Sequence, residues 1–365
     1  MMIQFEDRKT QSAPRRRFSI RMRFHPIFTV IALFILFNWL MFKTFFIPTA
    51  SMEQTLLAGD VILVSKLHYG TQTPKTLLQI PLMHQTIRWT RIPSYLSWIQ
   101  LPTYRLPGFS KVKRGDIVIF NNPQEFSIPV DQRTYYIKRC IGLPGDVVHM
   151  NKLQLSVNEE KQESYSNLQH TYHLRTSTRL SDWFFRQHNI SKYMSTQRGY
   201  LIYTTAQQAA QLAQLPYVQD IRPNIMPPAY HDPKVYPHSR LLPGNKDNFG
   251  PLTIPAKGTK IAINATTLAQ YASVITHYEG HKNVRIVKGE LWINDQPVKE
   301  YTFRQDYYFV MGDNRHDSHD SRFWGFLPAD HLLGKAVLVI CSFDPQKGAF
   351  SKIRWDRFFQ RVDNL

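Results

Sequence analysis

An uninterrupted apolar stretch near the N-terminus constrains this chain more than any other feature of its sequence. Between Phe24 and Phe42 there is no Lys, Arg, Asp or Glu. After Lys43 the apolar run resumes and continues to Pro48. A helix of this length crosses roughly 30 Å of hydrocarbon, and a lysine near its end can extend its ammonium group to the interface. We therefore expect one transmembrane helix over residues 26–46.

The residues before this stretch predict its orientation. Residues 1–25 contain seven basic side chains against Glu6 and Asp7. Positive charge next to a membrane helix favours the cytoplasmic side, so the N-terminus is expected in the cytoplasm and the rest of the chain outside. A cleaved signal peptide is the rival interpretation, because Thr49-Ala50-Ser51 resembles a small-residue cleavage site. The apolar run is longer than the usual hydrophobic region of a signal peptide, which favours the anchor.

Composition narrows the classes of partner. The formal net charge is +18, which suits either nucleic acid or anionic lipid. The basic residues are spread along the chain without a nucleic-acid-binding motif, so we predict contact with membrane lipid and none with nucleic acid. Two cysteines, Cys140 and Cys341, are too few for a disulfide framework. Both lie in apolar runs, so we favour buried free thiols, while a disulfide remains possible outside the cytoplasm.

Short apolar or alternating runs between Gly and Pro turns dominate the rest of the chain and predict a mainly β fold. Strands are expected at 57–66, 117–120, 134–141, 147–148, 284–287, 290–293, 307–311 and 335–341. We place the β core in two parts, residues 47–151 and 290–345. Residues 152–289 are rich in Gln, His, Ser and Tyr, with a possible helix around 205–215, and are expected to form an inserted α+β subdomain.

Residues 346–365 form a basic and aromatic C-terminal segment. Its alternation of bases and aromatic rings suits a helix that lies in the membrane interface. A solvated helix packed on the domain explains the same pattern, and both interpretations remain open.

Two short segments carry the residues with the clearest chemical meaning. Ser51 follows directly on the apolar stretch, and Lys138 lies near the end of the strand-like run Tyr135–Arg139. A serine hydroxyl is a weak nucleophile until a base removes its proton. A lysine becomes that base where burial lowers its pKa. The ordinary interpretations are a capping serine and an exposed edge lysine, but their setting behind the apolar stretch favours a membrane-anchored serine–lysine protease.

Four segments stand in order behind the apolar stretch: Ser51-Met52-Glu53-Gln54-Thr55-Leu56, 114–120, 136–146, and the Gly-Asp-Asn-Arg segment with its continuation, 312–325. This set resembles bacterial type I signal peptidase, the membrane-bound enzyme that removes signal peptides from exported proteins. The resemblance covers the anchor and roughly residues 45–66, 112–151 and 290–343, and it leaves out the middle insertion. Gln54 stands where the family usually has proline, so nearby substrate preference could differ.

The resemblance implies a role for each matching residue. Ser51 would be the nucleophile and Lys138 the general base. The Thr49 hydroxyl and the Ser51 N–H would form the oxyanion hole. Ser318 would orient the lysine, and Asp320 and Arg322 would hold its loop by an ion pair. Shallow pockets for small side chains would bind the substrate in an extended form and involve Ile47, Met52, Ile62, Tyr136 and Ile137.

The expected reaction is amide hydrolysis through an acyl-enzyme, with preprotein signal peptides as substrates and no cofactor or metal. The run His316–Asp320 superficially resembles a metal site, but alternating His and Asp in a loop are usually solvated. The enzyme is expected in the bacterial cytoplasmic membrane, single-pass, with its catalytic domain on the extracytoplasmic side. The alternatives are a soluble self-cleaving protease of the repressor type, a catalytically silent membrane-anchored binding protein, and a lipoprotein-type signal peptidase, which needs paired aspartates within several membrane helices.

Overall fold

The computed structural model describes residues 26, 28–31, 33–34, 40–76, 84–87, 90, 92–96, 98–162, 165–345 and 352–365. Among these residues no helix is both long and apolar enough to cross a membrane. The expected cytoplasmic segment 1–25 and residues 27, 32 and 35–39 of the expected membrane helix lie outside the described residues. The end of that helix was placed wrongly, because Phe42–Phe46 form strand β1 and pair along their whole length with residues 61–65.

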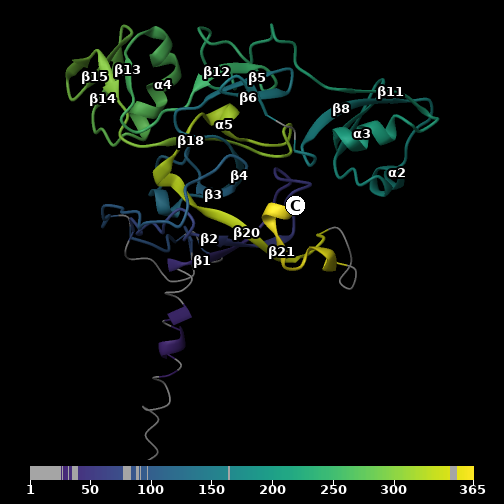
Figure 1. The fold of residues 1–365 in the computed structure, drawn as a ribbon, viewed down its shortest axis with the longest axis horizontal. Helices are drawn as coiled ribbons and strands as arrows, with labels where there is room; N and C mark the ends of the chain where they lie inside the picture. Colours follow the sequence, from purple (N-terminus) through teal and green to yellow (C-terminus); the bar gives the residue numbers. More distant parts are fainter. Residues whose placement is uncertain are drawn as a thin grey trace, which may run out of the picture.

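An antiparallel sheet of eight strands forms the lower layer of the molecule (Figure 1). Its strands are β1, β2 (Asp60–Ser65), β20 (Leu332–Ser342), β3 (Ile117–Asn121), β4 (Tyr135–Gly142), β18 (Tyr307–Met311) and β19 (Leu327–Pro328) in that order, with β21 (Gln360–Arg361) beside β20. Strand β20 lies between β2 and β3, so the C-terminal part of the core completes a sheet begun by the N-terminal part. The mainly β fold and the predicted core strands are confirmed.

A second layer packs on this sheet through shared apolar side chains. It contains the sheet β12 (Phe249–Thr253), β5 (Val147–Asn151), β6 (Gln154–Val157) and β7 (Glu160–Lys161), the pair β13 (Lys260–Ala262) and β17 (Glu300–Thr302), the sheet β14 (Val284–Val287), β15 (Glu290–Ile293) and β16 (Gln296–Val298), and helix α4 (Ala265–His277). Leu268 and Val274 of α4 belong to the same buried cluster as Ile141 and Phe309 of the main sheet. Much of the expected insertion is therefore part of the central core.

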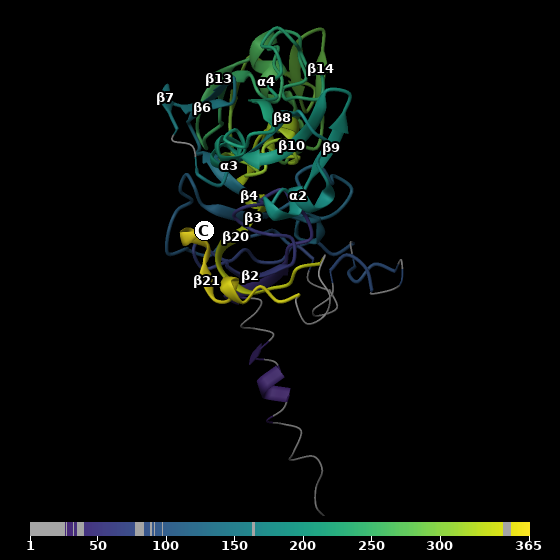
Figure 2. The same cartoon turned by 90° about the vertical axis from the view of Figure 1, so that its right-hand side faces the viewer.

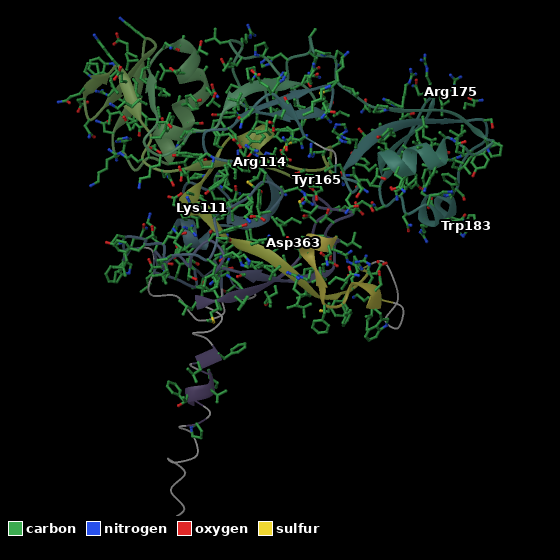
Figure 3. The ribbon with its side chains drawn as sticks, viewed as in Figure 1. Lys111, Arg114, Tyr165, Arg175, Trp183 and Asp363 are labelled. Carbon is green, nitrogen blue, oxygen red and sulfur yellow. The ribbon has the colours of Figure 1, made fainter. Side chains whose placement is uncertain are left out.

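A third unit, residues 169–223, is here called the side unit. It consists of the sheet β11 (Val218–Pro223), β8 (Gln169–Thr176), β10 (Gly199–Thr205) and β9 (Tyr193–Thr196), with helices α2 (Asp182–Gln187) and α3 (Ala206–Leu212). It has a hydrophobic cluster of its own, which includes Phe185 and Ile202. Figure 1 shows it on the right-hand flank of the molecule, and in Figure 2 it faces the viewer; Figure 3 marks Arg175 and Trp183 on it. The expected helix around 205–215 is α3, capped by Thr205.

The C-terminal segment does not form the expected helix within the described residues. Residues Trp355–Arg357 form one 3-10 turn, and β21 then pairs with β20. The Arg357 guanidinium binds the buried Asp60 carboxylate at 2.7 Å, which fastens this segment to the start of β2. Both cysteines are free thiols; Cys140 is buried, as expected, whereas Cys341 is only partly buried.

Candidate active site

Ser51 and Lys138 meet in the structure although 87 positions separate them in sequence. Ser51 begins a tight turn that follows the end of β1, in which the Leu56 N–H donates to the Met52 carbonyl. Lys138 lies on the central strand β4. Its Nζ donates to Ser51 Oγ at 2.7 Å and to the Ile137 carbonyl at 2.9 Å. Only 8% of Ser51 and 5% of Lys138 is exposed, so the pair is shielded from bulk water.

Burial changes the acid–base chemistry of this lysine. Removal from water disfavours the charged ammonium and lowers the pKa of Lys138 to about 8, against 10.5 for a free side chain. The carboxylates of Asp320 and Asp313 oppose this effect, and the Arg322 guanidinium adds to it. A substantial fraction of Lys138 is therefore neutral in mildly alkaline water, which is the form that accepts a proton.

A cavity of about 510 Å³ opens beside the pair. Its walls come from the end of β1, the turn at Ser51 and the first half of β4, and it is lined by Phe45, Phe46, Ile47, Pro48, Thr49, Ala50, Ser51, Ile62, Ile119, Thr134, Tyr135, Tyr136, Ile137, Lys138, Asp317 and His319. Four of the five predicted substrate-binding residues are in this wall. Met52 is not, because its side chain is completely buried in the core cluster with Leu56 and Val64.

The predicted oxyanion donors lie at the rim of the same cavity. Thr49 is exposed there, two residues before Ser51. Within the part of the chain that the structure describes, neither the Thr49 hydroxyl nor the Ser51 N–H donates a hydrogen bond. Both donors are thus available to an oxygen that develops negative charge next to Ser51.

The loop of residues 312–320 lies against the nucleophile turn from the other side. The Asn314 N–H donates to the Ser51 carbonyl at 3.1 Å, and its side-chain amide donates to the Ala50 carbonyl at 3.2 Å. A Cβ atom on Gly312 would come within 2.5 Å of the Ser51 carbonyl oxygen, so only glycine permits this approach. Sequence reasoning missed Asn314, although it belongs to the Gly-Asp-Asn-Arg motif.

The expected ion pair between Asp320 and Arg322 is present and fully buried. The guanidinium binds both carboxylate oxygens, at 2.9 and 2.8 Å, and the Gly312 N–H donates to the same carboxylate at 3.0 Å. Burial favours the neutral acid, but Arg322 and the Gly312 N–H outweigh it and lower the pKa of Asp320. The expected hydrogen bond from Ser318 to Lys138 is absent from the described residues. The Nζ donors go instead to Ser51 and to the Ile137 carbonyl.

A second buried ion pair connects the nucleophile turn to β4. Arg139 binds both oxygens of Asp313, at 2.8 and 2.6 Å. The Thr55 hydroxyl donates to Asp313 Oδ2 at 2.6 Å. This network joins the turn at 51–56, the strand beside Lys138 and the loop at 312–320, which are far apart in sequence. The charge pattern alone did not predict which arginine and aspartate would pair.

Gln54 has a left-handed backbone conformation, with φ of 73°. Proline holds φ near −65°, so the residue that the family usually has here does not fit this turn.

Among the described residues, no cluster of His, Cys, Asp or Glu is arranged to hold a metal ion. His316 is engaged otherwise, between Asp247 and Thr171.

Comparison with known proteins identifies the family to which the chain belongs. The model of the family described as signal peptidase, peptidase S26, matches residues 20–219 and 251–341. Signal peptidase I of Buchnera aphidicola (subsp. Acyrthosiphon pisum) is 26% identical over 342 residues, which cover 93% of this chain and 81% of that protein. Signal peptidase I of Haemophilus influenzae is 22% identical over 337 residues, which cover 92% and 74%. The crystal structure of a signal peptidase I from Enterococcus faecalis, 18% identical, covers 62% of this chain and 97% of that one, with a TM-score of 0.22 that is too low to compare the folds.

The structure is that of a mainly β protein with a serine beside a predominantly apolar cavity, and the family match makes it a hydrolase. The chain belongs to the signal peptidase family, peptidase S26, and is a serine endopeptidase. The activity that this family supports is the removal of signal peptides. The family match also extends over most of residues 152–289, which the resemblance in the motifs had left out.

Proposed function

We propose that this protein is a membrane-bound signal peptidase that uses Ser51 as nucleophile and Lys138 as general base. The observation that carries the proposal is the 2.7 Å hydrogen bond between Lys138 Nζ and Ser51 Oγ, two residues that are both largely buried. Nucleophilic catalysis by serine requires a base within hydrogen-bond distance and in its unprotonated form, and a buried lysine supplies both.

In the acylation step, Ser51 Oγ attacks the carbonyl carbon of the scissile peptide while its proton passes to neutral Lys138. The negative charge that develops on the carbonyl oxygen is stabilised by the Ser51 N–H and the Thr49 hydroxyl, each such donor being worth about 10²–10³ in rate. The carbon–nitrogen bond then breaks, and the Lys138 ammonium returns its proton to the leaving amine. The products of this step are the free amino terminus of the mature protein and an ester on Ser51.

In the deacylation step, a water molecule takes the place of the departed amine. Lys138, neutral again, accepts a proton from this water as its oxygen attacks the ester carbon. The ester bond to Ser51 Oγ breaks, and the lysine gives the proton to that oxygen. The signal peptide leaves with a new carboxyl group, which releases its proton to water, and the Ser51–Lys138 pair returns to its initial state.

The cavity suits an extended substrate with small side chains near the cut. Its wall is formed by the end of β1 on one side and the start of β4 on the other, and it is predominantly apolar. Ile47, Ile62 and Ile137 line it together with Ser51. We propose that these branched side chains restrict the first and third positions before the scissile bond to small residues. An Ala-x-Ala site fits this description, with the substrate lying beside a strand.

We place the enzyme in the bacterial cytoplasmic membrane on the evidence of the sequence. The apolar stretch up to Phe42 is bordered by seven basic residues on its N-terminal side. That asymmetry puts the N-terminus in the cytoplasm and the catalytic sheet on the opposite side, where signal peptides emerge. The catalytic sheet begins with β1 at Phe42, and Ser51 follows nine positions later, so the nucleophile lies near the proposed anchor.

The test is cleavage of a precursor with an Ala-x-Ala site by the full chain in detergent, with Ser51→Ala and Lys138→Ala beside the wild type. We expect cleavage by the wild type alone. We also expect a serine-directed acylating probe to form a covalent adduct with the wild type and none with Ser51→Ala. Cleavage that survives in the Lys138→Ala variant would exclude the lysine as base. A folded wild type that binds the precursor without cutting it would favour a catalytically silent binding protein.

A further inference from the structure

The loop of residues 312–320 is enclosed between the nucleophile turn and the side unit. On the side-unit face, the Gln169 N–H donates to the Asp313 carbonyl at 3.0 Å, and the Arg315 N–H donates to the Gln169 carbonyl at 2.9 Å. Gln169 and Asn314 thereby form a parallel bridge at the start of β8. The side unit thus contacts the backbone of the loop that touches Ser51.

His316 fastens the same loop at a second point. The Thr171 N–H of β8 donates to His316 Nδ1 at 3.0 Å, and His316 Nε2 donates to Asp247 Oδ1 at 2.7 Å. The side chains of His316 and Asp247 are both completely buried. Asp247 is held in turn by the Met226 N–H at 2.9 Å, so the histidine is anchored to two separate segments.

These two bonds define the protonation state of the imidazole. A backbone N–H can donate to Nδ1 only if that nitrogen carries no proton, and Nε2 then carries the single proton that Asp247 accepts. Among the charged groups around the ring, Lys246 and Arg322 disfavour a second proton and Asp247 favours it, while His170 of β8 faces the ring edge-on. Burial is the largest effect and lowers the pKa of His316, so the neutral form persists near neutral pH.

Two residues before His316, the fixed loop contacts the backbone of the nucleophile turn. Asn314, two positions before His316, donates to the carbonyls of both Ser51 and Ala50, and the Asp317 N–H donates back to the Asn314 carbonyl at 3.1 Å. Further along, Asp320 supplies the largest opposing charge effect on the pKa of Lys138. A shift of this loop would therefore displace the nucleophile and change the environment of the base at once.

From this geometry we infer that His316 is a positioning residue for the Ser51–Lys138 pair, and that β8 and the turn at 245–248 serve as the support to which it fastens the loop. The inference rests on the proposed function. It gives part of the segment 152–289 a role in catalysis, because the support holds the loop whose Asn314 contacts the nucleophile turn. A misplacement of reacting groups by about 1 Å costs roughly 10²-fold in rate, so modest loosening suffices to be measured.

The experiment uses the full chain in detergent with variants of His316. His316→Ala removes these two bonds and also the contact of the Thr171 hydroxyl with Nδ1. His316→Asn keeps an acceptor close to the backbone for the Thr171 N–H. The matched control is His173→Ala, which lies on the same strand, is exposed and bonds only to Asn224 among the described residues. For His316→Ala we expect kcat to fall roughly 10- to 100-fold with KM within about twofold, partial recovery in His316→Asn, and no change in the control.

The pH profile separates positioning from simple loss of fold. A loosened loop admits water to Lys138, so the apparent pKa in kcat/KM should rise from about 8 toward that of free lysine in His316→Ala. Thermal unfolding gives the folded fraction of each variant. A loss of activity that follows the folded fraction, with an unchanged pH profile, would overturn the inference, as would full activity in His316→Ala. If the wild type itself does not cleave, the proposed function fails, and that outcome is distinct from either of these.

Discussion

Two lysines in this molecule, one in the main sheet and one in the side unit, show how the same side chain is put to opposite uses. Lys138 is buried and donates to a hydroxyl and a carbonyl, and burial lowers its pKa to about 8. Lys192 of the side unit is half exposed and binds the Asp317 carboxylate at 2.7 Å. Its slight burial lowers the pKa, but the hydrogen bond and charge of Asp317 raise it to a greater extent. A lysine can act as a base where burial lowers its pKa and no carboxylate binds its ammonium group directly to raise the pKa again.

The ion pairs of the two regions differ in the same way. Around the cleft, Arg139–Asp313 and Arg322–Asp320 are almost completely buried, and each joins or braces loops that carry the reacting groups. In the side unit, Arg222–Asp220 lies exposed at 3.2 Å on β11. Buried pairs are costly to break but specify position, whereas exposed pairs contribute little. The buried ion pairs lie next to the proposed catalytic residues, where they fix the positions of the loops.

The largest expected difference between the regions is the loss in free energy of unfolding when an ion pair is broken. Asp313→Asn should lower the free energy of unfolding by about 3–5 kcal/mol, because Arg139 is left buried without its carboxylate. Asp220→Asn should change it by less than about 1 kcal/mol. Denaturant unfolding of both variants measures this contrast, and equal effects would contradict the distinction between the two kinds of pair.

The two lysines should also differ in their effect on the pH dependence. Because Lys138 acts in its neutral form, kcat/KM should rise with pH through about 8 and level off above it, an increase of about 100-fold between pH 6 and pH 9. Lys192→Met should leave the position of this rise unchanged. The check is a pH series with substrate well below KM, and a flat profile in the wild type would rule out the lysine as base.

Substitutions of two glycines compare close packing beside the cavity with backbone strain far from it. In Gly312→Ala the new Cβ meets the Ser51 carbonyl oxygen, so we expect kcat to fall roughly 10- to 100-fold. Gly258 has a positive φ but open space around it, so Gly258→Ala should cost about 1 kcal/mol of stability and leave kcat unchanged. Paired measurements of kcat and thermal unfolding distinguish the two, and an active Gly312→Ala variant would show that the turn can retreat.

The smallest expected effect concerns left-handed residues in the two regions. Gln54→Gly in the nucleophile turn should raise the free energy of unfolding by up to about 1 kcal/mol, since glycine adopts its φ of 73° without strain. Asn189 of the side unit has φ of 53°, and Asn189→Gly should gain less because asparagine tolerates this conformation. Gln54→Pro should be destabilising by more than about 1 kcal/mol. Stabilisation by the proline would mean that the turn has a different backbone.

Most strands of the core were predictable because their residues are apolar in uninterrupted or alternating runs. The error at Phe42–Phe46 arose because apolarity alone does not distinguish the end of a membrane helix from a strand. Residues 152–289 were treated as one insertion because their composition is polar. In fact α4 and β12 contribute to the main core, whereas β8 to β11 form a separate sheet. Composition does not reveal which helices and strands pack their apolar faces into the main core and which form a core of their own.

The sequence by itself determined the pair of residues proposed for catalysis, Ser51 and Lys138, because their motifs lie in local segments that can be read in order. It also determined the family and the mainly β class. Only the tertiary structure decided that Lys138 lies 2.7 Å from Ser51 Oγ, that Asp313 pairs with Arg139, and that Asn314 and His316 tie the catalytic loop to its neighbours. These contacts join segments far apart in the chain, and they depend on packing and desolvation, which no local pattern encodes.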